Sequence, residues 1–131
     1  MSTIPSISEL LPHAGPMRLL HRVLEHGPEG AACEARTEDA AIFRDASGRV
    51  PAWVAIEWMA QCSGIHGAAL VIARGEKPGL GFLTGGRAIR LLVPYLPEAE
   101  TLRVEARPAG QAAGLYSFAC RTLTQAGELL A

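Results

Sequence analysis

The sequence predicts an α+β fold in which an antiparallel sheet curls around one long buried helix. Residues 53–73 carry apolar side chains nearly all round the expected helix, which is typical of a helix wrapped by other structure. Segments of strand-like composition flank this helix on both sides, with Gly- and Pro-containing turns between them. Hydrophobic residues make up 49% of the chain and charged residues 19%, so we expect one domain over residues 1–131 with a single core.

The part of the chain before the long helix predicts a short helix and then a hairpin. Residues 6–11 begin with a Ser and Glu pair typical of a capping box, which indicates one or two helical turns. Residues 17–24 and 31–37 are expected to pair as strands, because the turn 25–30 between them contains Gly and Pro. Pro51 is the residue type favoured at a first helical position, so we expect the long helix to begin there.

The part of the chain after the helix predicts the rest of the sheet. Proline-containing loops separate three strand candidates, which are residues 80–92, 101–107 and 114–123. Residues 128–131 are expected to begin another strand. This order of elements places several strands against one helix, as the α+β class requires.

Charge and hydropathy exclude two classes of partner. The formal net charge is −1, so the chain has no global basic field to hold nucleic acid by counterion release. The N-terminal residues lack the basic start and apolar run of a signal peptide, and polar residues at Glu57, Gln61 and His66 interrupt the longest apolar segment. We therefore expect no nucleic-acid or membrane partner, and a soluble, cytoplasmic protein.

The spacing of cysteines and histidines predicts neither a metal site nor a disulfide framework. The three cysteines, Cys33, Cys62 and Cys120, are odd in number and form no C-x-x-C pair. The four histidines show no metal-ligand spacing such as H-x-x-x-H. We therefore expect no metal and no cofactor, and a reducing compartment.

Glu57 is the first candidate for chemistry, because it stands one turn into the apolar helix. A carboxylate among apolar neighbours is costly unless it is hydrogen-bonded, paired or protonated. Such surroundings also bring carboxyl groups in general into the range useful for proton transfer at neutral pH. The alternative is that the carboxylate faces solvent or caps a neighbouring loop. From the residues alone, these two interpretations have similar weight.

Three further features surround Glu57 in the expected structure. Gln61 lies one turn later on the same helix face, where it is expected to orient the carboxylate. The helix start at residues 51–53 leaves backbone N–H groups that would polarise a carbonyl oxygen. His13 is held between prolines in a turn, whereas His66 points roughly opposite to Glu57 and is left out of the site.

Two segments resemble a known family: L-P-H-A-G-P-M-R-L-L-H-R-V at residues 11–23 and V-P-A-W-V-A-I-E-W-M-A-Q at residues 50–61. They are similar to the β-hydroxyacyl acyl-carrier-protein dehydratases of fatty-acid synthesis, which carry L-P-H-R-x-P-F-L-L-V-D-R-V and M-P-G-V-L-x-x-E-A-M-A-Q. The P-H-x-G-P-M and E-W-M-A-Q forms are more similar still to the ApeP-like dehydratases, which are associated with aryl-polyene pigment synthesis. Residues 80–90 resemble the strand after the helix in these proteins, so the likeness spans most of the chain.

The resemblance implies a hotdog fold and a dimer whose protomers share a continuous sheet, with two acyl-binding tunnels at the interface. It implies an acyl thioester as substrate, carried on acyl carrier protein or coenzyme A. The dimer is expected to be a homodimer or a heterodimer with another hotdog subunit.

The sequence also departs from the family pattern. The catalytic histidine of the fatty-acid enzymes lies in a G-H-F-P loop, and counting back from Glu57 without gaps places its position at Phe43. The family's glycine at the helix start is Ala52, and the aspartate of L-L-V-D-R-V is replaced by His21. His13 matches the histidine of the L-P-H segment, which resembles a wall of the active-site entrance, so we hypothesise that it replaces the missing group.

The resulting hypothesis is dehydration of a 3-hydroxyacyl thioester. Glu57 protonates the departing hydroxyl, or catalyses the reverse, and His13 takes the C2 proton. The backbone amides of Ala52 and Trp53 bind the thioester oxygen. Substrate contacts are expected from six residues, which are Pro51, Ala52, Trp53, Gln61, Phe43 and Phe82.

Two alternatives stay open at this point. A hotdog thioesterase resembles this architecture and uses a helix carboxylate to activate water or to attack the thioester. A non-catalytic hotdog subunit would pair with an active dehydratase or only bind acyl chains. The residues leave chain length, and aromatic or aliphatic character, undetermined.

Overall fold

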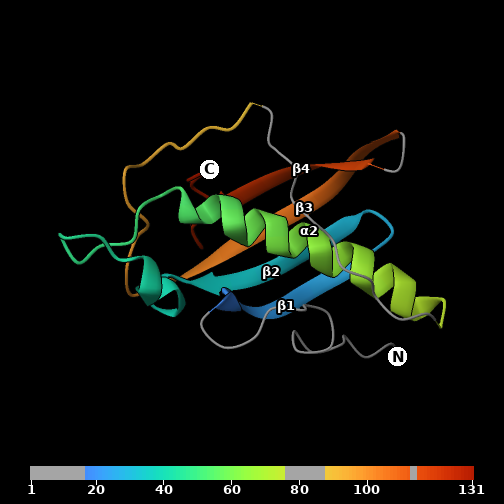
Figure 1. The fold of residues 1–131 in the computed structure, drawn as a ribbon, viewed down its shortest axis with the longest axis horizontal. Helices are drawn as coiled ribbons and strands as arrows, with labels where there is room; N and C mark the ends of the chain where they lie inside the picture. Colours follow the sequence, from blue (N-terminus) through green and yellow to red (C-terminus); the bar gives the residue numbers. More distant parts are fainter. Residues whose placement is uncertain (1–16, 76–87, 113–114) are drawn as a thin grey trace.

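The computed structural model describes residues 17–75, 88–112 and 115–131 (Figure 1). It contains a long helix and strands in the expected order. The elements are β1 (Leu20–Gly27), β2 (Gly30–Arg36), the 3₁₀ segment η2 (Thr37–Phe43), α2 (Val54–Ala73), β3 (Thr101–Ala112) and β4 (Leu115–Leu123).

The four strands form one antiparallel sheet in the order β1-β2-β3-β4, and α2 crosses one face of it (Figure 1). The chain makes the β1–β2 hairpin, crosses over through α2, and returns as β3 beside β2. The C-terminal residues extend the sheet beyond β4, because Leu129 bridges to Leu123 and the Leu130 carbonyl accepts a 2.9 Å hydrogen bond from the Leu92 amide. This arrangement of an antiparallel sheet on one long helix is the expected α+β hotdog fold.

The sheet-facing side of α2 forms the centre of the core. Trp58, Cys62 and Ile65 have no exposed surface, and β2 meets them with the small residues Ala31, Cys33 and Ala35, which let the bulky helix side chains approach closely. Burial of a large apolar side chain contributes about 1.5–3 kcal/mol, so this face fixes how α2 lies on the sheet. Among residues 17–75, 88–112 and 115–131, no helix combines the length and the apolar character needed to span a membrane.

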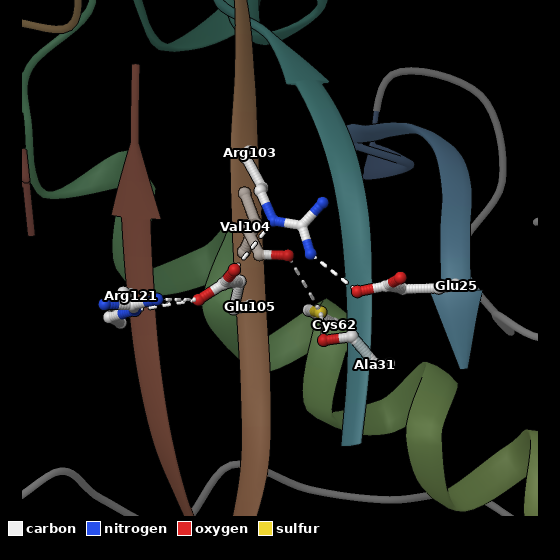
Figure 2. Close-up of polar contacts among 7 residues, drawn as sticks. All are labelled: Glu25, Ala31, Cys62, Arg103, Val104, Glu105 and Arg121. Carbon is white, nitrogen blue, oxygen red and sulfur yellow. Dashed lines mark hydrogen bonds and ion pairs between the residues drawn. The ribbon is translucent and has the colours of Figure 1, made fainter. Parts of the chain in front are cut away.

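The opposite face of the sheet carries charged side chains. Arg103 donates to Glu105 at 2.7 Å and to Glu25 at 2.6 Å, and Arg121 donates to the other oxygen of Glu105 at 2.7 Å (Figure 2). Arg22 and Glu34 form a further pair on this face. The sheet therefore has one apolar and one polar face, as expected for an antiparallel sheet that packs on the core with one side only.

The first hairpin is confirmed, but β1 lies further along the chain than expected and the turn is shorter. The pairing continues to Gly27 and Gly30, so only Pro28 and Glu29 connect the strands. Gly30 has a φ of +146°, and a Cβ there would lie 2.3 Å from the Ala106 carbonyl oxygen. Only glycine fits so close to β3. Gly30 also pairs with Gly27 as the first residue of β2, so it belongs to the strand and not to the turn.

Two other boundaries were wrong. The helix begins at Val54 and not at Pro51, because Pro51 is held in a bridge with Tyr95 outside the helix. β3 was expected to end at residue 107, but it continues to Ala112 through a register irregularity between Pro108 and Gly110. Such an irregularity accommodates a proline that has no N–H to donate to the ladder.

The segments expected at 6–11 and 80–92 lie wholly or partly outside the described residues. The short helix at 6–11 is outside them, and so are residues 80–87 of the strand expected at 80–92. Residues 88–92 are not assigned to a strand, although the Leu92 amide pairs with Leu130. The strand expected at 128–131 is present as a bridge and a set of hydrogen bonds to residues 122–124.

The charged face predicts an acid-sensitive contribution to stability. Burial alone would raise the pKa of the Glu105 carboxyl, but hydrogen bonds from Arg103 and Arg121 outweigh this and hold the pKa below its ordinary value of 4.5. A lowered folded-state pKa stabilises the fold above 4.5, and this contribution is lost as the pH falls through the lower folded-state value. Glu105→Gln is therefore expected to lower the urea midpoint at neutral pH.

The difference between wild type and Glu105→Gln should shrink steadily as the pH is lowered below 4.5. Glu29→Gln is a matched control, because Glu29 is exposed in the hairpin turn, and it should track the wild type throughout. A difference between Glu105→Gln and wild type that does not change with pH would contradict this account of the arginine contacts.

Candidate functional site

Glu57 lies in the first turn of α2, on the side that the sheet does not cover. The next residue, Trp58, points into the core with no exposed surface, whereas Glu57 is half-buried. Trp53, one turn before Glu57, is 45% exposed, and Gly64, two turns after it, is also exposed. Within the described part of the chain, Glu57 makes no hydrogen bond or ion pair. Its carboxylate therefore has no polar partner among the described residues and lies on the side of α2 away from the sheet.

The side of α2 away from the sheet is only partly covered. An apolar helix was expected to be wrapped, yet Ile56, Met59 and Ala60 are half-buried and Leu70 is 38% exposed. The described sheet has one layer and so covers one side of the helix. The remaining apolar surface is the place where further structure would have to pack.

An aromatic pair lies at the helix start. The ring of Phe43, at the end of η2, meets the ring of Trp53 edge to face, with 5.4 Å between the ring centroids. Such edge-to-face pairs add about 0.5–1.5 kcal/mol beyond the area that they bury. Phe43 therefore stands as an apolar wall beside the first turn of α2, at the position where the resemblance placed a catalytic histidine.

The backbone at the helix start is braced by a loop that sequence reasoning did not include in the site. The Ala52 amide donates to the Pro94 carbonyl at 3.0 Å, and the Leu96 amide donates to the Val50 carbonyl at 3.0 Å. We expected the Ala52 and Trp53 amides together to bind the thioester oxygen. This expectation is corrected, because the Ala52 N–H already has an acceptor. The Trp53 N–H makes no hydrogen bond to the described residues and is the one that stays available.

Further contacts hold this brace in place. Tyr95 donates its hydroxyl to Asp45 at 2.7 Å, and the Arg49 guanidinium lies 3.7 Å from the centre of the Tyr95 ring. Hydrogen bonds from the Ser47 and Tyr95 hydroxyls lower the pKa of Asp45 to about 2. The sequence signal for this loop was the proline-flanked tyrosine at residues 94–97, which was interpreted only as a separator between strands.

Gln61 does not contact Glu57. Its side-chain oxygen accepts a 3.1 Å hydrogen bond from the Leu19 amide, and its side-chain nitrogen donates at 2.9 Å to the Met17 carbonyl. The expectation that Gln61 orients the Glu57 carboxylate is thus wrong in this structure, because backbone groups use both of its polar atoms. Gln61 is 3% exposed, so loss of these bonds would cost about 1–3 kcal/mol for each backbone group left unpaired.

The histidines divide between the core and the surface. His66 is 4% exposed on the sheet side of α2, and its ring lies edge to face with Phe118, so it points away from Glu57 as predicted. His21 lies at the surface, with its Nδ1 atom 3.7 Å from Asp39. His13 and Phe82, two of the expected site residues, lie outside the described residues.

The thiols are placed for packing and not for nucleophilic chemistry. Contact with the Cys33 thiol and burial between α2 and the sheet both raise the pKa of Cys62, and burial raises that of Cys120. Cys62 points at the carbonyls of Ala31 and Val104, at 3.6 Å and 3.5 Å (Figure 2). A thiol held protonated in the core is a poor nucleophile and a poor metal ligand. Among the residues that the structure describes, no cluster of His, Cys, Asp and Glu is suited to a metal ion.

The hollows on the described surface lie away from Glu57. One is bordered by Arg36, Glu38, Thr101 and Gln125, and the other lies between the β1–β2 turn and β3. Glu57 instead lies on α2 between Trp53, one turn before it, and Gln61, one turn after it. Chemically, this arrangement offers a carboxylate for proton transfer beside a backbone N–H donor and apolar side chains.

Comparison with known proteins gives two results. The family model of ApeP-like proteins, described as ApeP dehydratase, matches residues 5–131. A solved structure described as the dehydratase heterocomplex ApeI:P from Xenorhabdus doucetiae superposes with a TM-score of 0.88. The two chains are 29% identical in sequence, and the match covers 96% of this chain and 85% of that one.

Proposed function

We propose, from the premise that this chain belongs to the family of ApeP-like dehydratases, that it catalyses loss of water from a 3-hydroxyacyl thioester. The family match and the similarity to a dehydratase support a hydro-lyase activity. The thioester substrate is inferred from the sequence motifs and from the apolar surface around Glu57. The acyl group would be carried on acyl carrier protein or coenzyme A, in fatty-acid or polyene-type lipid synthesis.

The observation that carries the proposal is the Glu57 carboxylate, half-buried in the first turn of α2 without a partner among the described residues. A carboxyl group in this position is able to exchange a proton with a bound substrate. Trp53 and Phe43 make its surroundings apolar on the side of the helix start. An apolar acyl chain would cover this surface, and its thioester end would then lie beside the carboxyl group.

The reaction needs two proton transfers. A base removes the C2 proton, the electron pair left behind forms the C2=C3 double bond, and the C3–O bond breaks so that the hydroxyl leaves as water. We assign protonation of the hydroxyl to Glu57 and removal of the C2 proton to His13. The Trp53 amide is assigned to the thioester oxygen, on which negative charge develops.

The open face of α2 supports assembly with a second hotdog subunit. The described residues leave apolar surface around Glu57 uncovered, and a second chain would close it. The similar structure is titled a heterocomplex, so we propose a homodimer or a heterodimer with another hotdog chain. Phe43 replaces the usual histidine, and this favours a heterodimer in which the partner supplies a base if His13 does not.

Product analysis tests the proposed reaction. The purified protein, with any subunit that copurifies, is incubated separately with a 3-hydroxyacyl thioester and with a saturated acyl thioester. We expect an enoyl thioester from the first and no change in the second. Free thiol from either substrate would favour a thioesterase, and no turnover of either would favour a subunit that only binds or pairs.

Glu57→Gln keeps the shape of the side chain and removes its titrating oxygen. Enoyl formation is expected to fall by about two to four orders of magnitude, the range typical of a general acid–base group. The melting temperature should stay close to that of the wild type, because Glu57 makes no polar contact with the described residues. Glu29→Gln, in the exposed hairpin turn, is the matched control and should retain full activity. Full activity in Glu57→Gln would refute the assignment.

His13→Ala tests which group takes the C2 proton. If His13 replaces the histidine missing at Phe43, turnover should fall as far as in Glu57→Gln, about two to four orders of magnitude. His26→Ala, next to the hairpin turn, controls for the loss of an imidazole elsewhere. A mild effect of His13→Ala together with a severe effect of Glu57→Gln would assign the base to a partner subunit.

A further inference from the structure

We propose that Gln61 is a positioning residue that fixes one wall of the substrate site, by holding the entry to β1 against α2 one turn after Glu57. This inference rests on the proposed function, because it concerns the substrate of the same site. It differs from the role that the sequence suggested, in which Gln61 would orient the Glu57 carboxylate.

The geometry of Gln61 defines what it holds. Its side-chain nitrogen donates to the Met17 carbonyl and its side-chain oxygen accepts from the Leu19 amide, so one side chain bonds two backbone groups of the segment that precedes β1. Leu19 has no exposed surface and Leu20 is 3% exposed, so the segment is also anchored in the core by its side chains. Met17 is therefore fixed at its backbone, while its own side chain stays 45% exposed.

The clamp lies one helix turn from the candidate catalytic residue. Residues four apart on a helix lie on the same face, so Gln61 follows Glu57 along α2 and Trp53 precedes it. Trp53 is 45% exposed, and Met17, whose carbonyl accepts the hydrogen bond from Gln61, is also 45% exposed. The residues of α2 that continue this open face are small, namely Ala60 and Gly64. An acyl chain would lie over the small residues with Met17 as its side wall.

Methionine is suited to this position. Its unbranched thioether side chain adapts its shape to an apolar ligand without leaving a rigid gap. The hydrogen bonds of Gln61 fix the position of the Met17 backbone, from which this adaptable side chain extends. The Gln61 amide therefore controls how wide the substrate site is beside Met17. Gln61 would act on the substrate only through Met17, without touching the reacting atoms.

Two other buried side chains of α2 carry a polar atom, but neither links the helix to the segment before β1. Trp58 Nε1 and His66 Nδ1 lack partners among the described residues, but both side chains belong to the sheet side of α2. Gln61 is the buried polar side chain of α2 that links the helix to the chain entering β1.

The test compares three variants with the wild type, as the protein purifies with any copurifying subunit. Gln61→Met removes both hydrogen bonds at similar size, Gln61→Glu keeps an acceptor for the Leu19 amide but loses the donor to Met17, and Met17→Ala removes the wall itself. Gln125→Met is the matched control, because Gln125 is an exposed glutamine whose amide bonds to Thr101. For each, kcat and KM are measured with a short and a long 3-hydroxyacyl thioester, together with the pH dependence of kcat/KM.

The expected result is a change in chain-length preference. The ratio of kcat/KM for the long and short substrates should change by about tenfold or more in Gln61→Met and in Met17→Ala, in the same direction and mainly through KM. Gln61→Glu should fall between Gln61→Met and wild type, and Gln125→Met should match the wild type. The pH profile of kcat/KM should not shift in Gln61→Met.

Four outcomes would overturn the inference. A shifted pH profile with unchanged chain-length preference would mean that Gln61 acts on Glu57. A lower melting temperature with unchanged kinetics per folded molecule would mean that its role is only structural. If the wild type dehydrates neither substrate, the proposed function and this inference both fail. If the wild type is active but Gln61→Met has the same chain-length preference, only this inference fails.

Discussion

The packing of one side of α2 on the sheet determines the rest of the structure. Trp58, Cys62 and Ile65 are fully buried against the small residues of β2, and the large apolar area that they remove from water fixes the rotation of the helix about its axis. Once that rotation is fixed, Glu57 has to lie on the side of α2 away from the sheet. The position of this candidate site is therefore a consequence of core packing.

Two polar braces then set the position of the chain around this helix. At its start, the loop at Pro94 and Leu96 pairs with the backbone of residues 50–52. One turn after Glu57, Gln61 pairs with the segment that enters β1. Each brace satisfies backbone groups that would otherwise be costly to leave unpaired. The hydrogen bonds that stabilise this region therefore also fix the backbone on both sides of Glu57 along α2.

The fold was largely predictable from the sequence, because hydrophobic periodicity and turn residues report directly on burial. The apolar segment at 53–73 predicted α2 to within one residue, and the Gly- and Pro-containing turn predicted the first hairpin. The errors came from residues whose role depends on distant partners. Pro51 looked like a helix start, but its bridge to Tyr95 is a long-range contact that no local pattern encodes.

The same distinction explains what was predictable of the site. Glu57 was recognisable because a carboxylate in an apolar helix is locally anomalous, and the structure leaves it half-buried on the open face. The partners of Gln61 and of the Ala52 amide were not recognisable, because Met17 and Pro94 are distant in sequence and offer only backbone carbonyls. Every residue has a backbone carbonyl, so residue identities carry no signal for such contacts.

The central claim is that the chain removes water across C2 and C3 of a 3-hydroxyacyl thioester, and that the Glu57 carboxyl group on α2 transfers the proton of the C3 hydroxyl. The most direct measurement runs the reaction in reverse, with a 2-enoyl thioester in deuterated water, and examines the product by mass spectrometry and NMR. The account predicts a 3-hydroxyacyl thioester with one deuterium at C2, formed by the wild type and lost in Glu57→Gln. A free acid without deuterium at C2, or equal incorporation in Glu57→Gln and wild type, would contradict it.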